Sequence, residues 1–80
     1  MRVLVVDDHT TVRRGVRELL LDAYVDAVVD EAGTAAAALE RVRAADYDLV
    51  TLDISMPDAH GLELLERMLR ARPGLRVLML

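Results

Sequence analysis

The chain begins with the run RVLVV over Arg2–Val6, and two carboxylates, Asp7 and Asp8, follow it at once. An unbroken run of β-branched and aliphatic residues is typical of a parallel strand with both faces covered by other elements. A second run of this kind, DLVTL at residues 48–52, is followed directly by Asp53. The two runs predict buried parallel strands, each ending in acidic residues.

The segments between the strands have helical periodicity. Apolar residues recur at helical spacing along one side of residues 11–21, with Arg and Glu on the other side, which predicts an amphipathic helix. A second helix is predicted to follow Thr34 as its N-cap and to end near residue 44. A third is predicted from residue 62 to about residue 72, where a Pro-Gly pair stops it. The remaining two predicted strands are residues 25–31 and 76–80.

Strands and helices therefore alternate over the 80 residues, in the order strand, helix, strand, helix, strand, helix, strand. Short connections and right-handed crossovers place such strands in one parallel sheet with helices on both faces. We expect one small α/β domain. Because the last predicted strand has no helix after it, we also expect the chain to be part of a longer domain.

Composition excludes several classes of function. Fourteen acidic residues against ten basic ones give a net charge of −4, without the positive field expected of a DNA-binding module. Phe and Trp are absent, which disfavours stacking on nucleic-acid bases. The absence of cysteine excludes thiolate chemistry and is consistent with the cytoplasm. No apolar run approaches the roughly 20 residues of a membrane span, so we expect no membrane contact.

Three carboxylates are predicted to meet at one edge of the sheet. Ligands of open parallel sheets bind at the carboxyl ends of the strands, where Asp7, Asp8 and Asp53 lie. If the first and third strands are neighbours, the three share one pocket and repel one another unless a cation joins them. Oxygen ligands without His or Cys nearby suit Mg²⁺. A carboxylate beside Mg²⁺ can attack phosphorus and form an aspartyl phosphate.

A structural alternative exists for each carboxylate. Asp7 or Asp8 could cap the first helix, and Asp53 could cap the turn after the third strand. Convergence of all three at one predicted edge favours the functional interpretation. His9 and His60 lie in predicted loops with ordinary neighbours, so we expect neither to be catalytic, and we place His9 at the rim of the pocket.

These residues resemble a known family. VLVVDDH at residues 3–9 with Arg13 and Gly15, DLVTLD at 48–53 and DISMPDAHG at 53–61 are similar to the receiver domain of two-component response regulators. The pattern over residues 7–20 resembles the NarL/FixJ subfamily, whose members usually carry a C-terminal helix-turn-helix that binds DNA. The resemblance implies a flavodoxin-like α/β fold, a doubly wound parallel sheet of strand order 2-1-3-4. It makes residues 1–80 a partial receiver domain, with the fifth strand and last two helices missing.

For individual residues, the resemblance makes Asp53 the phosphoacceptor for a sensor histidine kinase and Asp8 a direct Mg²⁺ ligand. It places Asp7 beside the metal, largely through water, and adds Asp53 and the backbone carbonyl of Ser55 as ligands. The family also uses a Ser or Thr after the fourth strand and a Lys after the fifth, and both positions lie beyond residue 80. We therefore expect this chain to accept phosphate slowly and not to be a turnover enzyme.

A haloacid-dehalogenase-like phosphohydrolase would carry D-x-D-x-T after the first strand, and DDHTT at residues 7–11 does not match. A phosphate-independent pseudo-receiver would act only as an interaction module, which the retained carboxylates disfavour. An incompletely covered sheet also predicts self-association of the chain.

Overall fold

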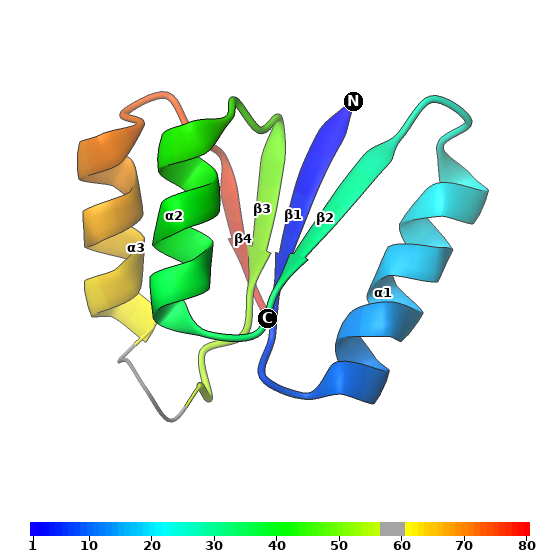
Figure 1. The fold of residues 1–80 in the computed structure, drawn as a ribbon, viewed down its shortest axis with the longest axis horizontal. Helices are drawn as coiled ribbons and strands as arrows, with labels where there is room; N and C mark the ends of the chain where they lie inside the picture. The colour runs from blue at the N-terminus through cyan, green and yellow to red at the C-terminus, as the bar shows by residue number, and fades with distance from the viewer. Residues whose placement is uncertain (57–60) are drawn as a thin grey trace.

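The computed structural model describes residues 1–56 and 61–80, which form a four-stranded parallel sheet between helices (Figure 1). The elements are β1 Arg2–Val6, α1 Thr10–Ala23, β2 Val28–Ala32, α2 Ala35–Ala44, β3 Leu49–Leu52, α3 Gly61–Ala71 and β4 Val77–Met79. The predicted alternation is confirmed, whereas His60 and the loop residues 57–59 lie outside the described residues. In the described part of the chain, no helix has the length and apolar character to cross a membrane.

The strands pair in the order β2-β1-β3-β4, as the family resemblance implied. β1 lies between β2 and β3, and its last residue, Val6, is the register partner of both Ala32 and Leu52. The Asp53 N–H continues this ladder by donating to the Val6 carbonyl at 2.9 Å. Since β1 and β3 are parallel neighbours that end level with each other, Asp7 and Asp53 leave the sheet at the same edge.

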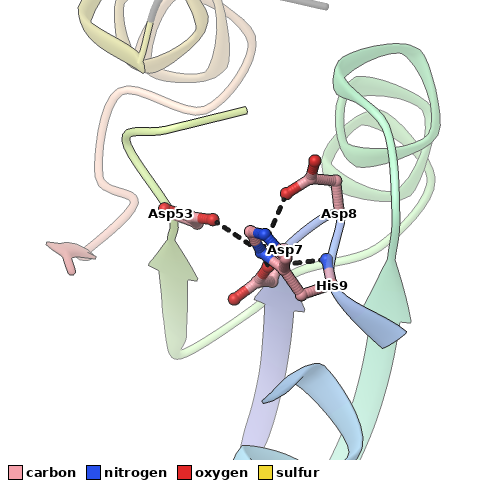
Figure 2. A group of neighbouring side chains, drawn as sticks. All are labelled: Asp7, Asp8, His9 and Asp53. Carbon is pink, nitrogen blue, oxygen red and sulfur yellow. Dashed lines mark hydrogen bonds and ion pairs between the residues drawn. The ribbon is translucent and has the colours of Figure 1, made fainter. Parts of the chain in front are cut away.

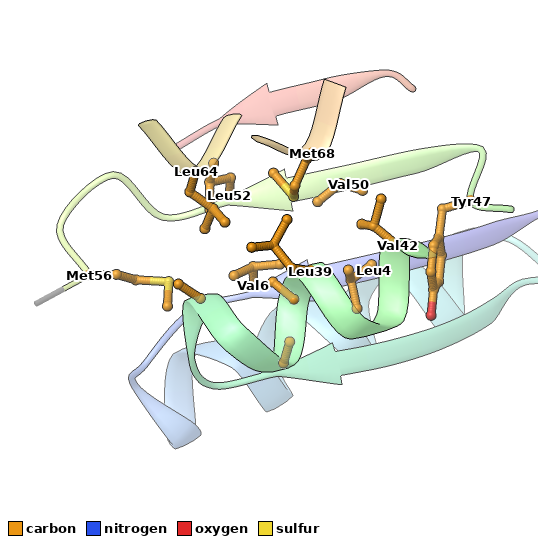
Figure 3. Packing of buried hydrophobic residues seen from close by; sticks show 13 residues of the cluster. Leu4, Val6, Leu39, Val42, Tyr47, Val50, Leu52, Met56, Leu64 and Met68 are labelled. Carbon is orange, nitrogen blue, oxygen red and sulfur yellow. The ribbon is translucent and has the colours of Figure 1, made fainter. Parts of the chain in front are cut away.

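Alternate residues of β1 enter two separate cores. Leu4 and Val6 belong to the larger core, which lies under α2 and α3 (Figure 3). Val3 and Val5 point to the opposite face and pack with residues of α1 and β2. The larger core also contains Ala38, Leu39, Val42, Val50, Leu52, Leu64 and Met68. Burial on both faces is the reason that β1 has a continuous apolar run instead of an alternating one.

Two local predictions have different outcomes. Thr34 is the N-cap of α2, as predicted, because its Oγ1 accepts the Ala37 N–H at 3.1 Å. β2 was expected from residue 25 but starts at residue 28. Residues 24–27 form a turn in which the Ala27 N–H donates to the Tyr24 carbonyl at 3.1 Å, and Val25 is 97% exposed. Apolar residues at positions 25 and 27 led to the longer predicted strand, but the turn at residues 24–27 keeps them outside the sheet.

A polar network joins the strands near the amino ends of β1 and β3. The hydroxyl of Tyr47, a buried residue, donates to Asp30 Oδ2 at 2.6 Å, and Arg2 Nη2 lies 3.1 Å from the same oxygen. The Tyr47 hydrogen bond is the largest cause that lowers the pKa of Asp30; partial burial opposes it and Arg2 reinforces it. The resulting stability is present above the pKa of unfolded Asp and is lost as the pH falls through the folded pKa.

We predict that Tyr47→Phe lowers the free energy of unfolding at neutral pH by roughly 1–2 kcal/mol, because a hydrogen bond to a partly exposed carboxylate is lost. The difference from the wild type should shrink in acid, where Asp30 is protonated in both proteins. Urea denaturation followed by circular dichroism at the two pH values measures both quantities. Tyr24→Phe, at the exposed tyrosine, is the control. A Tyr47→Phe chain as stable as this control would contradict the role of the network.

The sheet keeps an exposed apolar region on the α1 side. α1 packs against β1 and β2, whereas Leu78 of the outer strand β4 is 51% exposed and Leu80 is 59% exposed. Leu78 is the register partner of Thr51, which places it on the same face as Val5. An outer strand with unpaired backbone groups and exposed leucines favours pairing between copies.

We therefore predict that the chain self-associates and that Leu78→Glu weakens the association, because it places a charge on this face of β4. Light scattering across a concentration series measures the mass of the species in solution. Leu19→Glu, on an exposed position of α1, makes the same chemical change elsewhere and is expected to leave the association largely intact. A strictly monomeric wild-type chain would contradict the prediction.

Candidate functional site

Four polar side chains gather where β1 and β3 end: Asp7, Asp8, His9 and Asp53 (Figure 2). One ligand atom from each lies within 4.8 Å of the others. The three carboxylate side chains are 13%, 28% and 15% exposed in sequence order, so each is partly withdrawn from water. The predicted convergence of the carboxylates is confirmed, and it follows from the parallel pairing of β1 with β3.

Local turns orient these side chains. The N-cap of α1 is His9, so the alternative in which Asp7 or Asp8 caps that helix is wrong. Asp7 Oδ1 instead accepts the His9 backbone N–H at 2.8 Å. The alternative for Asp53 is confirmed, because its Oδ1 accepts the N–H of Ser55 at 3.0 Å and the Ser55 hydroxyl at 2.8 Å. This turn is compatible with a role of Asp53 in a functional site, because the hydrogen bonds hold the Asp53 carboxylate within the acidic cluster.

His9 lies at the rim of the pocket, as expected, because its side chain is 59% exposed and lines the pocket. Its neighbours are not ordinary, however, since Figure 2 shows the ring among the carboxylates. Its Nδ1 lies 2.8 Å from Asp7 Oδ1, 3.1 Å from Asp8 Oδ1 and 3.6 Å from Asp53 Oδ2. One feature of the sequence could have predicted this position: His9 lies two residues after Asp7, the spacing at which an Asp side chain commonly accepts a backbone N–H and forms a turn.

The electrostatics of the cluster follow from these contacts. The hydrogen bond with Asp7 is the largest cause that raises the pKa of His9, and the charge of Asp8 is the next. The Ser55 N–H is the largest cause that lowers the pKa of Asp53, against the opposing effect of desolvation; the Ser55 hydroxyl also lowers it. Asp53 is therefore ionised at neutral pH, which is the form required of a carboxylate nucleophile.

The donor set fits a hard divalent cation. Asp8 Oδ1 is buried and accepts no hydrogen bond from the described residues, although His9 Nδ1 lies near it. A buried carboxylate oxygen without a donor is costly, and a bound cation removes that cost. Three carboxylates suit Mg²⁺, whereas the imidazole departs from the expected oxygen-only set. Placing Mg²⁺ among the carboxylates would require the His9 ring to move aside. The Ser55 carbonyl as a ligand stays a prediction.

A cavity of about 280 Å³ adjoins the cluster. Its polar wall consists of Asp7, His9, Asp53 and Ser55, and its apolar wall includes Val12, Val16 and Leu80. Thr51 also lines the cavity, and its buried Oγ1 has no hydrogen-bond partner among the described residues. The carboxylates Asp7 and Asp53 therefore border a small cavity at the edge of the sheet.

Residues 3–80 match the family of response regulator receiver domains, and the chain belongs to that family. It is 47% identical over 81 residues to the DNA-binding transcriptional activator DevR/DosR of Mycobacterium tuberculosis, covering all of this chain and 37% of that protein. It is also 47% identical over 73 residues to a protein-glutamate methylesterase/protein-glutamine glutaminase of Agrobacterium fabrum, covering 90% of this chain and 20% of that enzyme. The chain thus spans well under half the length of these relatives.

Solved structures agree with the assignment. A CheY-like receiver domain protein from Methanospirillum hungatei superposes with a TM-score of 0.90 at 33% identity, covering 98% of this chain and 61% of that one. A LuxR-family two-component response regulator from Aurantimonas gives 0.89 at 33% identity, with 98% and 56% covered.

The response regulator TrrA of Thermotoga maritima, solved with Mg²⁺ and BeF, gives a TM-score of 0.88 at 32% identity, with 98% of this chain and 66% of that one covered. TrrA in complex with the histidine kinase ThkA gives 0.87 at 32% identity and the same coverage. The CheY-like fold is confirmed, and membership of the receiver family excludes the dehalogenase-like alternative.

We predict that Asp7→Asn lowers the pKa of His9 toward its usual value of about 6.5, because the substitution removes the charge of its hydrogen-bonding partner. A pH titration of the imidazole protons by NMR measures this value. Asp22→Asn, at an exposed position near the end of α1, is the control. An unchanged His9 pKa in Asp7→Asn would contradict the hydrogen bond between the two side chains.

The raised pKa of His9 also affects folding. It stabilises the fold below the pKa of unfolded His, and this contribution is lost as the pH rises through the folded pKa.

Proposed function

We propose that this chain is a phosphorylation switch that accepts a phosphoryl group on Asp53 from a sensor histidine kinase in the cytoplasm, with Mg²⁺ as the cofactor. One observation carries the proposal. In a chain of the receiver family, Asp53 meets Asp7 and Asp8 with ligand atoms within 4.8 Å of one another, at the edge where β1 and β3 end. Open parallel sheets bind their ligands at this edge.

In the proposed reaction, Asp53 supplies the nucleophile. An ionised oxygen of Asp53 forms a bond to phosphorus, the bond from phosphorus to the kinase imidazole nitrogen breaks, and that nitrogen keeps the electron pair. The product is an aspartyl phosphate and a free kinase histidine. The hydrogen bonds from Ser55 keep the carboxylate ionised and oriented.

The remaining residues of the site would hold the cation. Asp7, Asp8, Asp53 and the Ser55 carbonyl are the proposed ligands. Mg²⁺ in such a site neutralises charge on the oxygens of the transferring phosphoryl group. The buried Asp8 Oδ1, which accepts no hydrogen bond from the described residues and lies 3.1 Å from His9 Nδ1, supports a cation here.

The partners are proposed from similar proteins. TrrA, 32% identical to this chain, is solved in complex with a histidine kinase, which supports a kinase partner. DevR/DosR is a DNA-binding transcriptional activator, which supports transcription control as the output of the whole regulator. We assign DNA contact to a separate C-terminal domain, because the net charge of these 80 residues is −4. The similarity to the methylesterase covers only 20% of that enzyme, and we propose no turnover activity for this chain.

We predict that the chain, incubated with acetyl phosphate and Mg²⁺, gains the mass of one phosphoryl group and that Asp53→Asn abolishes the gain, because the nucleophile is absent. Intact-mass spectrometry over a long incubation measures it, since the chain contains no Lys to assist the transfer. Asp26→Asn, in the exposed turn before β2, is the matched control and should be labelled like the wild type. Chelation of Mg²⁺ should suppress the gain, whereas labelling that persists in Asp53→Asn would refute the assignment of the phosphoacceptor.

A further inference from the structure

Arg13 of α1 reaches from the helix to the loop that carries the acidic residues. Its Nη1 donates to the backbone carbonyl of Asp7 at 2.8 Å, and its Nε donates to Glu31 Oε1 on β2 at 2.9 Å. The Arg13 side chain is only 16% exposed, so both hydrogen bonds are partly shielded from water. The planar guanidinium makes the two bonds at once, which a single ammonium group cannot do with the same geometry.

Both backbone polar groups of Asp7 are hydrogen-bonded. The Asp7 N–H donates to the Ala32 carbonyl at the end of β2 at 3.1 Å, while its carbonyl accepts from Arg13. Asp8 is the next residue, and the His9 carbonyl accepts the Arg13 backbone N–H at 2.9 Å. The whole turn from Asp7 to His9 is therefore anchored to β2 and to the first turn of α1.

Gly33 provides the space for this arrangement. A Cβ atom at Gly33 would lie 2.9 Å from Arg13 Nη1, the same atom that bonds the Asp7 carbonyl. Any side chain at residue 33 would displace that nitrogen. The glycine just after β2 thus has a steric role at the loop after β1, although the two segments are far apart in sequence.

The charge of the guanidinium is directed away from the carboxylates. Glu31 pairs with Arg13, and its second oxygen lies 3.9 Å from Arg17 Nε. Arg13 bonds the backbone of Asp7 and not its carboxylate, so it orients the loop and leaves the acidic oxygens to a cation. Without such an anchor, mutual repulsion of three clustered carboxylates would favour opening of the loop.

We infer that Arg13, held by Glu31 and accommodated by Gly33, is a positioning residue that fixes Asp7 and Asp8 for binding of a divalent cation. This inference rests on the proposed function, since it concerns the same Mg²⁺ site. Residues that orient metal ligands typically account for a factor of 10 to 100 in metal affinity.

The test is a titration of the folded chain with Mg²⁺ alone, followed by the NMR shifts of the Asp8 and Asp53 amides. We expect Arg13→Met and Gly33→Ala each to weaken Mg²⁺ binding about tenfold relative to the wild type. Arg13→Lys keeps the charge but not the two-bond geometry and should also bind more weakly. Arg14→Met, at an exposed arginine one residue along α1, is the matched control and should bind like the wild type.

Gly33→Ala retains the Arg13 residue and displaces only its Nη1, so it tests the inference even where Arg13→Met does not fold. Urea denaturation with chelator present identifies the conditions in which each variant is folded, and affinities are compared only there. Wild-type affinity in folded Arg13→Met or folded Gly33→Ala would overturn the positioning role while leaving the proposed function intact. Wild-type Mg²⁺ affinity in Arg13→Lys would also overturn the positioning role, because a positive charge without the two-bond geometry would then be enough to maintain the site. A wild-type chain without a saturable Mg²⁺ response would overturn both.

Discussion

The parallel pairing of β1 with β3 makes the site possible. Both strands are buried, run in the same direction and end level with each other, so the residues that follow them emerge side by side. Asp7 and Asp8 are thereby brought to Asp53 across more than forty positions of sequence. An antiparallel partner, or a register shifted along β1, would separate the carboxylates. The cores on the two faces of β1 hold this register in place.

The site is electrostatically costly, and its surroundings offset that cost in different ways. Ser55 donates two hydrogen bonds to Asp53, and the His9 ring lies among the three carboxylates. Arg13 secures the backbone behind Asp7 while Glu31 takes up its charge. One Asp8 oxygen keeps no donor among the described residues. The cluster is thus stabilised within the fold, and the proposed function assigns its carboxylate oxygens to a cation.

Stability and chemistry are separated along the sheet. The pairing of Tyr47 with Asp30 lies near the amino ends of β1 and β3, where the Tyr47 hydroxyl and Arg2 both bond the carboxylate. The acidic cluster lies at the carboxyl ends of the strands, where the buried Asp8 Oδ1 accepts no hydrogen bond from the described residues. Aspartates therefore support the fold at one end of the sheet and form the proposed phosphoacceptor site at the other.

The sequence by itself determined the alternation of elements, the buried strands and the carboxylates that follow them, because apolar periodicity and the position of charges after strands are local properties. With the family resemblance, it also determined the strand order and the expected role of Asp53. It could not determine where β2 begins, the position of the His9 ring, or the reach of Arg13 to Asp7 and Glu31. Those features depend on how a turn folds back and on which side chains meet across distant segments, and only tertiary packing decides such contacts.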